Sequence, residues 1–117
     1  MKKYLVLLLA FLCLLAPVTG AISIHTFQVT IGSGVTAIST NANAGARQLI
    51  FQNNAAHVMR VGDSNTTSSR GALLNAASGG NGGGSLSVGP YYPNSLNLAE
   101  WYVAGTQNDV LDVLYLD

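Results

Sequence analysis

The chain has 117 residues, of which 49% are hydrophobic and only 9% are charged. This length allows one small domain. Beyond the first three residues, three scattered arginines stand against five acidic residues, a formal net charge of −2. Because binding to nucleic acid requires clustered basic side chains that neutralise phosphates, we expect no nucleic acid as a partner.

The first 21 residues have the layout of a secretory signal peptide. Lys2 and Lys3 precede the apolar run 4–16, and Pro17 ends that run before several small residues. This pattern predicts a cleavable N-terminal hydrophobic helix over 1–21, followed by a mature domain over 22–117. Small residues would allow cleavage after position 20, 21 or 23, and the alternative is a leader retained as an anchor. The mature protein is then expected in the periplasm or outside the cell, contacting a membrane only through its leader.

Cys13, inside the predicted leader, is the one cysteine of the sequence. The mature chain therefore cannot form an intramolecular disulfide, although exported domains of this size often rely on such bonds. Its stability must come from its apolar core or from contacts with neighbouring subunits. We expect a homo-oligomer for this reason.

The N-terminal half of the mature chain is predicted to form strands. Apolar and polar residues alternate over 22–31 and change phase near Thr26, which is typical of a half-buried strand with a bulge. Residues 35–39 are prone to form a strand, and the small polar residues of 40–46 predict a loop. The segments 47–52 and 57–61 flank a pair of asparagines and predict a β-hairpin.

The C-terminal half continues the pattern of short strands and turns. Glycine fills most of 78–85, which predicts a flexible loop. Asn97 and Glu100 have the spacing that caps one helical turn before a strand. Seven or eight short strands without a long helix indicate an all-β fold, a small antiparallel β-sandwich or jelly roll. Turns are expected at 62–65 and 105–109, and further strands at 86–88, 101–104 and 110–116. The short segment 66–69 is compatible with a strand, and 72–74 is apolar.

The order of these motifs resembles small β-sandwich virion structural proteins of tailed bacteriophages. The resemblance covers about 47–116 and is carried by five segments in order, 47–53, 58–64, 71–74, 98–105 and 110–115, with a glycine-rich break before Ser85 and Leu86. It implies a head-decoration, head-fibre or tail-associated module and carries over no catalytic residue. The added leader indicates a virion protein assembled at a membrane, or a phage- or host-encoded surface protein with the same sandwich.

Two motifs suggest chemistry, and each has a simpler interpretation. Gly62-Asp63-Ser64 matches the nucleophile block of certain lipases and esterases, but no histidine follows it. We therefore interpret it as a β-turn and expect no catalytic residue and no enzyme. The segment 79–86 resembles one calcium-binding nonapeptide in which Gly84 replaces the ligand aspartate, so no metal ion and no cofactor are expected.

Three aromatic residues are the candidate ligand contacts. Tyr91 and Tyr92 lie between two prolines, and Trp101 follows the predicted helical turn. Exposed rings of this kind can stack on the apolar faces of sugars, while the alternative is packing in the core. Our first hypothesis is a non-enzymatic, exported and oligomeric structural module, associated with a virion or a cell surface. The alternative is a secreted module that binds carbohydrate or another surface through these three rings.

Overall fold

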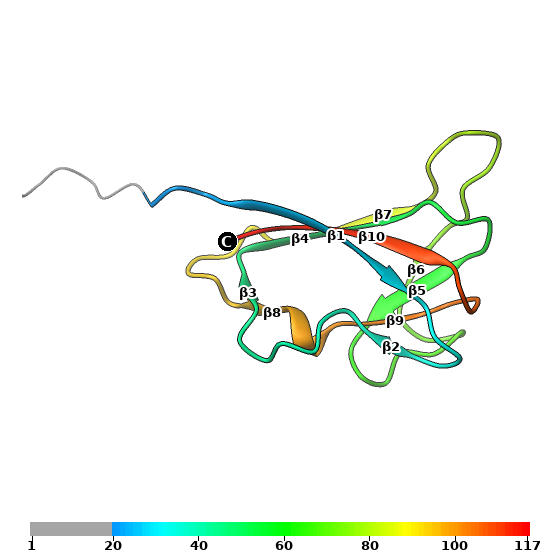
Figure 1. The fold of residues 1–117 in the computed structure, drawn as a ribbon, viewed down its shortest axis with the longest axis horizontal. Helices are drawn as coiled ribbons and strands as arrows, with labels where there is room; N and C mark the ends of the chain where they lie inside the picture. The colour runs from blue at the N-terminus through cyan, green and yellow to red at the C-terminus, as the bar shows by residue number, and fades with distance from the viewer. Residues whose placement is uncertain (1–19) are drawn as a thin grey trace, which may run out of the picture.

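A computed structural model describes residues 20–117, and the strands within them form antiparallel sheets. Most of the predicted leader, 1–21, lies outside the described residues. The prediction of an all-β fold is confirmed for these residues: two four-stranded sheets face each other as two layers (Figure 1), and the one helical element within 20–117 is a single 3₁₀ turn, η1, at Leu98–Glu100.

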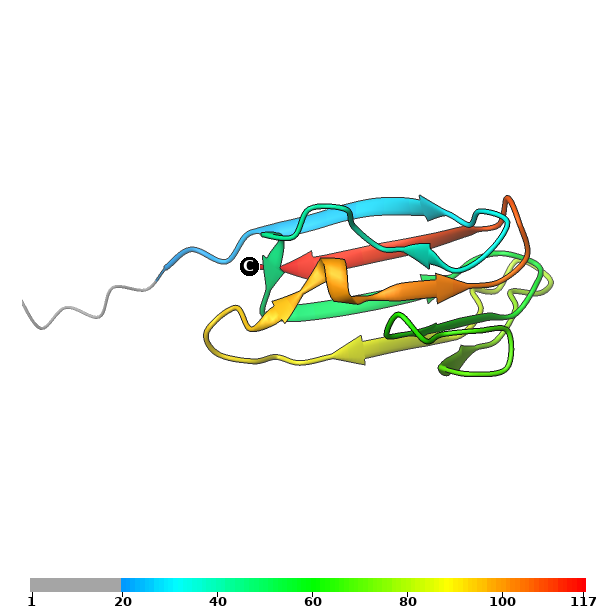
Figure 2. The ribbon, with the colours of Figure 1, turned by 90° about the horizontal axis from the view of Figure 1, so that it is seen from below.

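Sheet A contains the longer strands and has the order β1-β10-β4-β7. Sheet B, the opposite layer, has the order β2-β9-β5-β6, and β3 and β8 form a small third sheet. Figure 2 shows the four strands of sheet A side by side behind sheet B. The strands of sheet A are β1 (Ile24–Thr30), β4 (Gln48–Asn53), β7 (Ser85–Val88) and β10 (Val110–Leu116); the others are β2 (Thr36–Ala37), β3 (Gly45–Ala46), β5 (Met59–Gly62), β6 (Ala72–Leu74), β8 (Leu96–Asn97) and β9 (Tyr102–Ala104).

Strict alternation in the sequence decides which side chains enter the core. In β4 the side chains of Leu49, Phe51 and Asn53 are buried, while the residues between them are half-buried on the opposite face. This is the two-residue period of a strand whose outer face remains accessible to water. The same alternation in β10 buries Leu111 and Val113. The apolar core between the layers contains Val29, Ile31, Ile38, Ala46, Leu49, Phe51, Met59, Val61, Leu74, Leu98, Val103, Leu111 and Val113.

The predicted β-hairpin between 47–52 and 57–61 is wrong. Both segments are strands, but β4 belongs to sheet A and pairs with β10 and β7, whereas β5 belongs to sheet B and pairs with β6 and β9. The connection at 54–58 therefore crosses from one layer to the other. Alternating residues reveal a strand and its buried face, but not which strand lies beside it.

Three further details differ from, or refine, the sequence predictions. The expected bulge near Thr26 is absent, because all seven residues of β1 pair in continuous register with β10. Part of the expected loop at 40–46 forms β3, which pairs with β8. The expected helical turn is present as η1, and Asn97 caps it by accepting a hydrogen bond from the Ala99 N–H at 3.0 Å.

Candidate functional site

The outer face of sheet A is the broadest continuous surface that the long strands present to solvent. Even-numbered residues of β1, β4 and β10 point outward, and their register sets Thr26, Leu114 and Ile50 in one row. The next row contains Gln28, Asp112 and Gln52. A shallow depression of about 530 Å³ lies over these two rows. The first row is therefore mainly apolar, and the second consists of two amides and one carboxylate.

Asp112 is the one charged side chain on the outer face of the described strands of sheet A. Its carboxylate accepts a hydrogen bond from the Gln28 amide at 2.7 Å and another from the Asn54 amide. Both carboxylate oxygens are therefore engaged by neutral donors of the same chain. Apart from this carboxylate, which keeps its negative charge, the polar groups of the face are amides and hydroxyls.

Trp101 lines a different hollow, on the other side of the molecule from that face. Its ring packs against Phe51 with 5.4 Å between ring centroids, so part of the indole belongs to the core. The remaining part borders a pocket of about 320 Å³ together with Asp63 and Glu100. The indole therefore lies partly in the core and partly at the wall of this pocket.

Tyr91 and Tyr92 lie on the loop between β7 and β8 and are 51% and 78% exposed. The Arg47 guanidinium lies 4.1 Å from the centroid of the Tyr92 ring and also donates a hydrogen bond to the Tyr92 hydroxyl. The Arg47 carbonyl accepts a hydrogen bond from the Tyr91 N–H at 2.8 Å. One face of Tyr92 is thus covered by Arg47. Neither tyrosine lines the pocket of Trp101.

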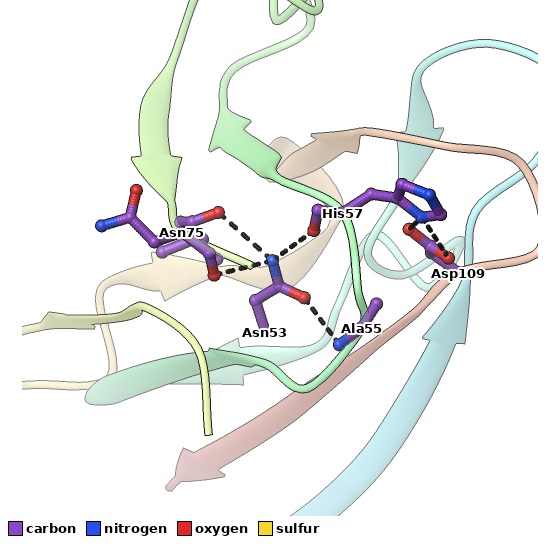
Figure 3. Close-up of polar contacts among 6 residues, drawn as sticks. Asn53, Ala55, His57, Asn75 and Asp109 are labelled. Atoms are coloured by element: carbon purple, nitrogen blue, oxygen red, sulfur yellow. Dashed lines mark hydrogen bonds and ion pairs between the residues drawn. The ribbon is translucent and has the colours of Figure 1, made fainter. Parts of the chain in front are cut away.

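Asn53 holds the crossing from sheet A to sheet B, and sequence reasoning missed this role (Figure 3). Its side chain is fully buried. The Nδ2 group donates to the backbone carbonyls of His57, Leu74 and Asn75 at 2.8, 3.2 and 3.0 Å, and Oδ1 accepts from the Ala55 N–H at 2.9 Å. One amide therefore ties β4 to the start of β5 and the end of β6. The signal was available, since Asn53 continues the buried phase of residues 49 and 51.

Both histidines contact aspartates. His57 Nδ1 lies 3.0 Å from a carboxylate oxygen of Asp109, which links the crossing segment to the turn before β10 (Figure 3). His25 Nε2 lies 3.2 Å from Asp117, and its ring stacks on Tyr115 with 4.6 Å between centroids. These pairs connect segments far apart in the sequence.

The Gly62-Asp63-Ser64 motif forms a turn, as expected. The Asp63 carboxylate accepts a hydrogen bond from the Asn65 N–H at 3.0 Å, the pattern by which aspartate stabilises its own turn. Ser64 is exposed at the tip. Within residues 20–117, no three His, Cys, Asp or Glu side chains group closely enough to hold a metal ion, and no helix has the length and apolar character to cross a membrane.

The comparisons with known proteins give no relative for this chain. Neither a family model, nor a curated protein, nor a solved structure matches it. The function is therefore inferred from the surfaces described above and from the order of motifs in the sequence.

Proposed function

We propose that this chain is a non-enzymatic, exported structural module that packs against other protein subunits, of the decoration or fibre type associated with virions. The observation that carries the proposal is the outer face of sheet A. It presents the apolar side chains of Ile24, Ile50 and Leu114 among uncharged amides and hydroxyls. Surfaces that bury against another protein are depleted in charge at their centre and retain hydrogen-bonding groups around it.

The composition supports the same role. A solvated sheet face usually carries charged residues, which keep it in water. Here Leu114 and Ile50 occupy the centre of the face, and the single carboxylate nearby, Asp112, is held by two amides. Such a face is suited to contact with another protein surface that also carries few charges. The order of strands and turns, with its resemblance to phage virion modules, supports a particle as the assembly.

The test begins with the native producing culture. Particles are sedimented from the cleared medium, and the protein is identified by intact mass in the pellet and in the supernatant. The proposal expects a species without the first 20 to 23 residues that travels with nucleic-acid-containing particles. A protein that stays soluble or bound to cells contradicts the virion assignment, and a full-length mass contradicts cleavage.

A charge placed at the centre of the outer face should reduce particle binding. We expect Leu114→Glu to lower the particle-bound fraction by about tenfold or more, because an interface would have to bury an unpaired carboxylate. Val35→Glu is the matched control: it adds the same charge at an exposed apolar position in the loop before β2. Equal binding of the two variants, both with wild-type thermal unfolding, would show that the outer face is not the contact surface.

Carbohydrate binding is the second candidate function, and the pocket of Trp101 favours it. An indole beside the carboxylates of Asp63 and Glu100 combines an apolar surface with hydrogen-bond acceptors, which is what a sugar ring and its hydroxyls require. The tyrosines contribute an exposed surface elsewhere, with Tyr92 stacked on Arg47.

Retention on insoluble peptidoglycan and on chitin tests this candidate. If the pocket binds sugar, Trp101→Ala should abolish retention and Glu100→Gln should weaken it. Trp101→Phe controls for the packing against Phe51, and Tyr92→Ala removes an aromatic ring outside the pocket. Retention that is unchanged by Trp101→Ala would eliminate the pocket as a glycan site.

A further inference from the structure

Strand β1 borders sheet A, and no other strand within 20–117 pairs with its outer edge. The order β1-β10-β4-β7 leaves β1 with β10 as its only described neighbour (Figure 2). The border strand β1 has seven residues, whereas the other border strands of the two four-stranded sheets, β7, β6 and β2, have four, three and two. Long border strands are exceptional because their unpaired backbone groups attract further strands.

The hydrogen bonds to β10 identify which backbone groups of β1 are unpaired. Ser23 and Asp117 exchange two backbone hydrogen bonds of 3.3 and 3.2 Å, and the Ile31 N–H donates to the Asp109 carbonyl at 2.9 Å. Bonded and non-bonded positions alternate in an antiparallel ladder. The odd-numbered residues therefore bond β10. The backbone N–H and C=O groups that point to the free edge belong to Ile24, Thr26, Gln28 and Thr30.

The side chains of β1 do nothing to prevent pairing. The strand contains no Asp, Glu, Lys, Arg or Pro, and its register with β10 has no bulge. Natural border strands are commonly protected by such features. Ile24 is 67% exposed on this strand. The nearest carboxylate on the same face, Asp112, is held by Gln28 and Asn54.

The free edge is complementary to itself. A two-fold axis perpendicular to the sheet and midway between the Phe27 residues of two copies sets Ile24 opposite Thr30 of the second copy and Thr26 opposite Gln28 of that copy. Every free N–H and C=O of the four outward residues then has a partner, and the two Phe27 side chains meet at the centre. The assembly through this edge stops at two copies, because both copies use the same edge for the contact. No like charges oppose each other in this register.

We propose that β1 pairs antiparallel with β1 of a second copy, centred on Phe27, so that two copies share one continuous eight-stranded sheet. The inference deepens the proposed assembly role by naming the partner of this edge. The same outer face then extends across both copies and doubles its area. A second copy is the occupant proposed because centring on Phe27 overlaps all seven residues of both strands, places no charged pair in register and sets the two Phe27 residues opposite each other.

Sedimentation velocity of the protein released by cells that express the full-length gene tests the pairing. We expect a concentration-dependent dimer. Thr26→Pro should raise the dissociation constant about thirtyfold or more, because it removes one interchain hydrogen bond from each copy. The Thr26 N–H points away from β10, so proline there breaks no bond within the sheet. If Thr26→Pro fails to fold, Thr26→Lys tests the same edge by charge repulsion, and an equimolar mixture with Thr26→Glu should restore the dimer.

Ser87→Lys is the matched control for Thr26→Lys, because it adds the same charge to the outer face of β7, the opposite border of sheet A. We expect it to leave the dimer unchanged. A monomeric wild-type protein overturns the inference, as does a dimer that survives both Thr26→Pro and Thr26→Lys. Loss of the dimer in Ser87→Lys as well as in Thr26→Lys would also overturn it, because the effect would not be specific to the β1 edge.

Cysteine cross-linking tests the register. With β1 centred on Phe27, a mixture of Thr26→Cys and Gln28→Cys proteins should form a mixed disulfide more readily than Thr26→Cys protein forms one with itself. The reverse preference overturns the register. These outcomes are separate from the particle experiment: a monomer leaves particle association standing, and absence from particles leaves the pairing standing.

Discussion

We expect Asn53→Ala to destabilise the protein by about 3–5 kcal/mol, since the three carbonyl groups that receive its amide hydrogens would lose a buried donor. The two hydrogens of the Asn53 Nδ2 group are shared among three carbonyl oxygens, so one substitution removes all three contacts together. Truncation also removes Asn53 Oδ1, which accepts a hydrogen bond from the Ala55 N–H. The crossing from sheet A to sheet B would lose its main polar link.

Urea denaturation followed by far-UV circular dichroism measures this effect. Asn53→Asp should be as damaging as Asn53→Ala or more so, because a buried carboxylate oxygen would face three carbonyl oxygens. Asn75→Ala is the matched control, because the exposed Asn75 contributes its backbone carbonyl to the network, and we expect a change within about 0.5 kcal/mol. A loss below about 1 kcal/mol for Asn53→Ala would contradict the role assigned to this amide.

Gly83→Ala is expected to cost about 2–3 kcal/mol or more, because a Cβ atom there would meet backbone atoms on three sides. It would lie 2.3 Å from the Asn75 carbonyl oxygen, 2.6 Å from the Asn53 carbonyl oxygen and 2.8 Å from the Ala77 nitrogen. Distances below 3.0 Å require the backbone to move. The Gly83 N–H also donates to the Asn53 carbonyl at 2.9 Å, which holds this segment against the end of β4.

Gly82→Ala is the control for this substitution. A Cβ there would approach no atom closer than 3.3 Å, and that atom is the end of the Gln52 side chain, which can move. We expect a change within about 0.5 kcal/mol. Thermal unfolding of both variants measures the difference. Equal melting temperatures would show that the segment rearranges freely and that the close approach of Gly83 is unimportant.

The glycine-rich segment shows how composition predicts only part of a loop. The sequence predicted a flexible loop across 78–85. A Cβ at Gly79 or Gly80 would meet no atom within 4 Å, and a hydrogen bond from the Asn81 N–H to the Ser78 carbonyl closes the turn around them. Gly83 and Gly84, in contrast, lie against the backbone of residues 74–77 and 53. Glycine permits both a turn that faces open space and a close approach of two backbone segments, so the number of glycines does not show which of the two is present. The neighbours that decide the matter come from distant strands.

The strands themselves were largely predictable, because alternation marks the buried face of β4, β5 and β10 without reference to their partners. The assignment of strands to the two layers was not predictable in the same way. Asn53 and Asn54 are equally suited to a hairpin turn and to a crossing, and the choice depends on β10 and β7 occupying both edges of β4. Similarly, the sequence placed Tyr91, Tyr92 and Trp101 in one hypothesis, whereas the structure puts Trp101 beside Asp63 and Glu100 and stacks Tyr92 with Arg47.

The pairing of Ser23 with Asp117 determines how the domain would respond to mechanical force. Because β1 and β10 are antiparallel, residues 23 and 117 lie side by side at one end of the pair. A pull applied between these two positions opens the ladder one hydrogen bond at a time, like a zipper, instead of loading all bonds together in shear. The domain should therefore unfold at low force when it is pulled between residues 23 and 117. A pull along the strands, between opposite ends of β1 and β10, would load all hydrogen bonds of the ladder together and should need a higher force.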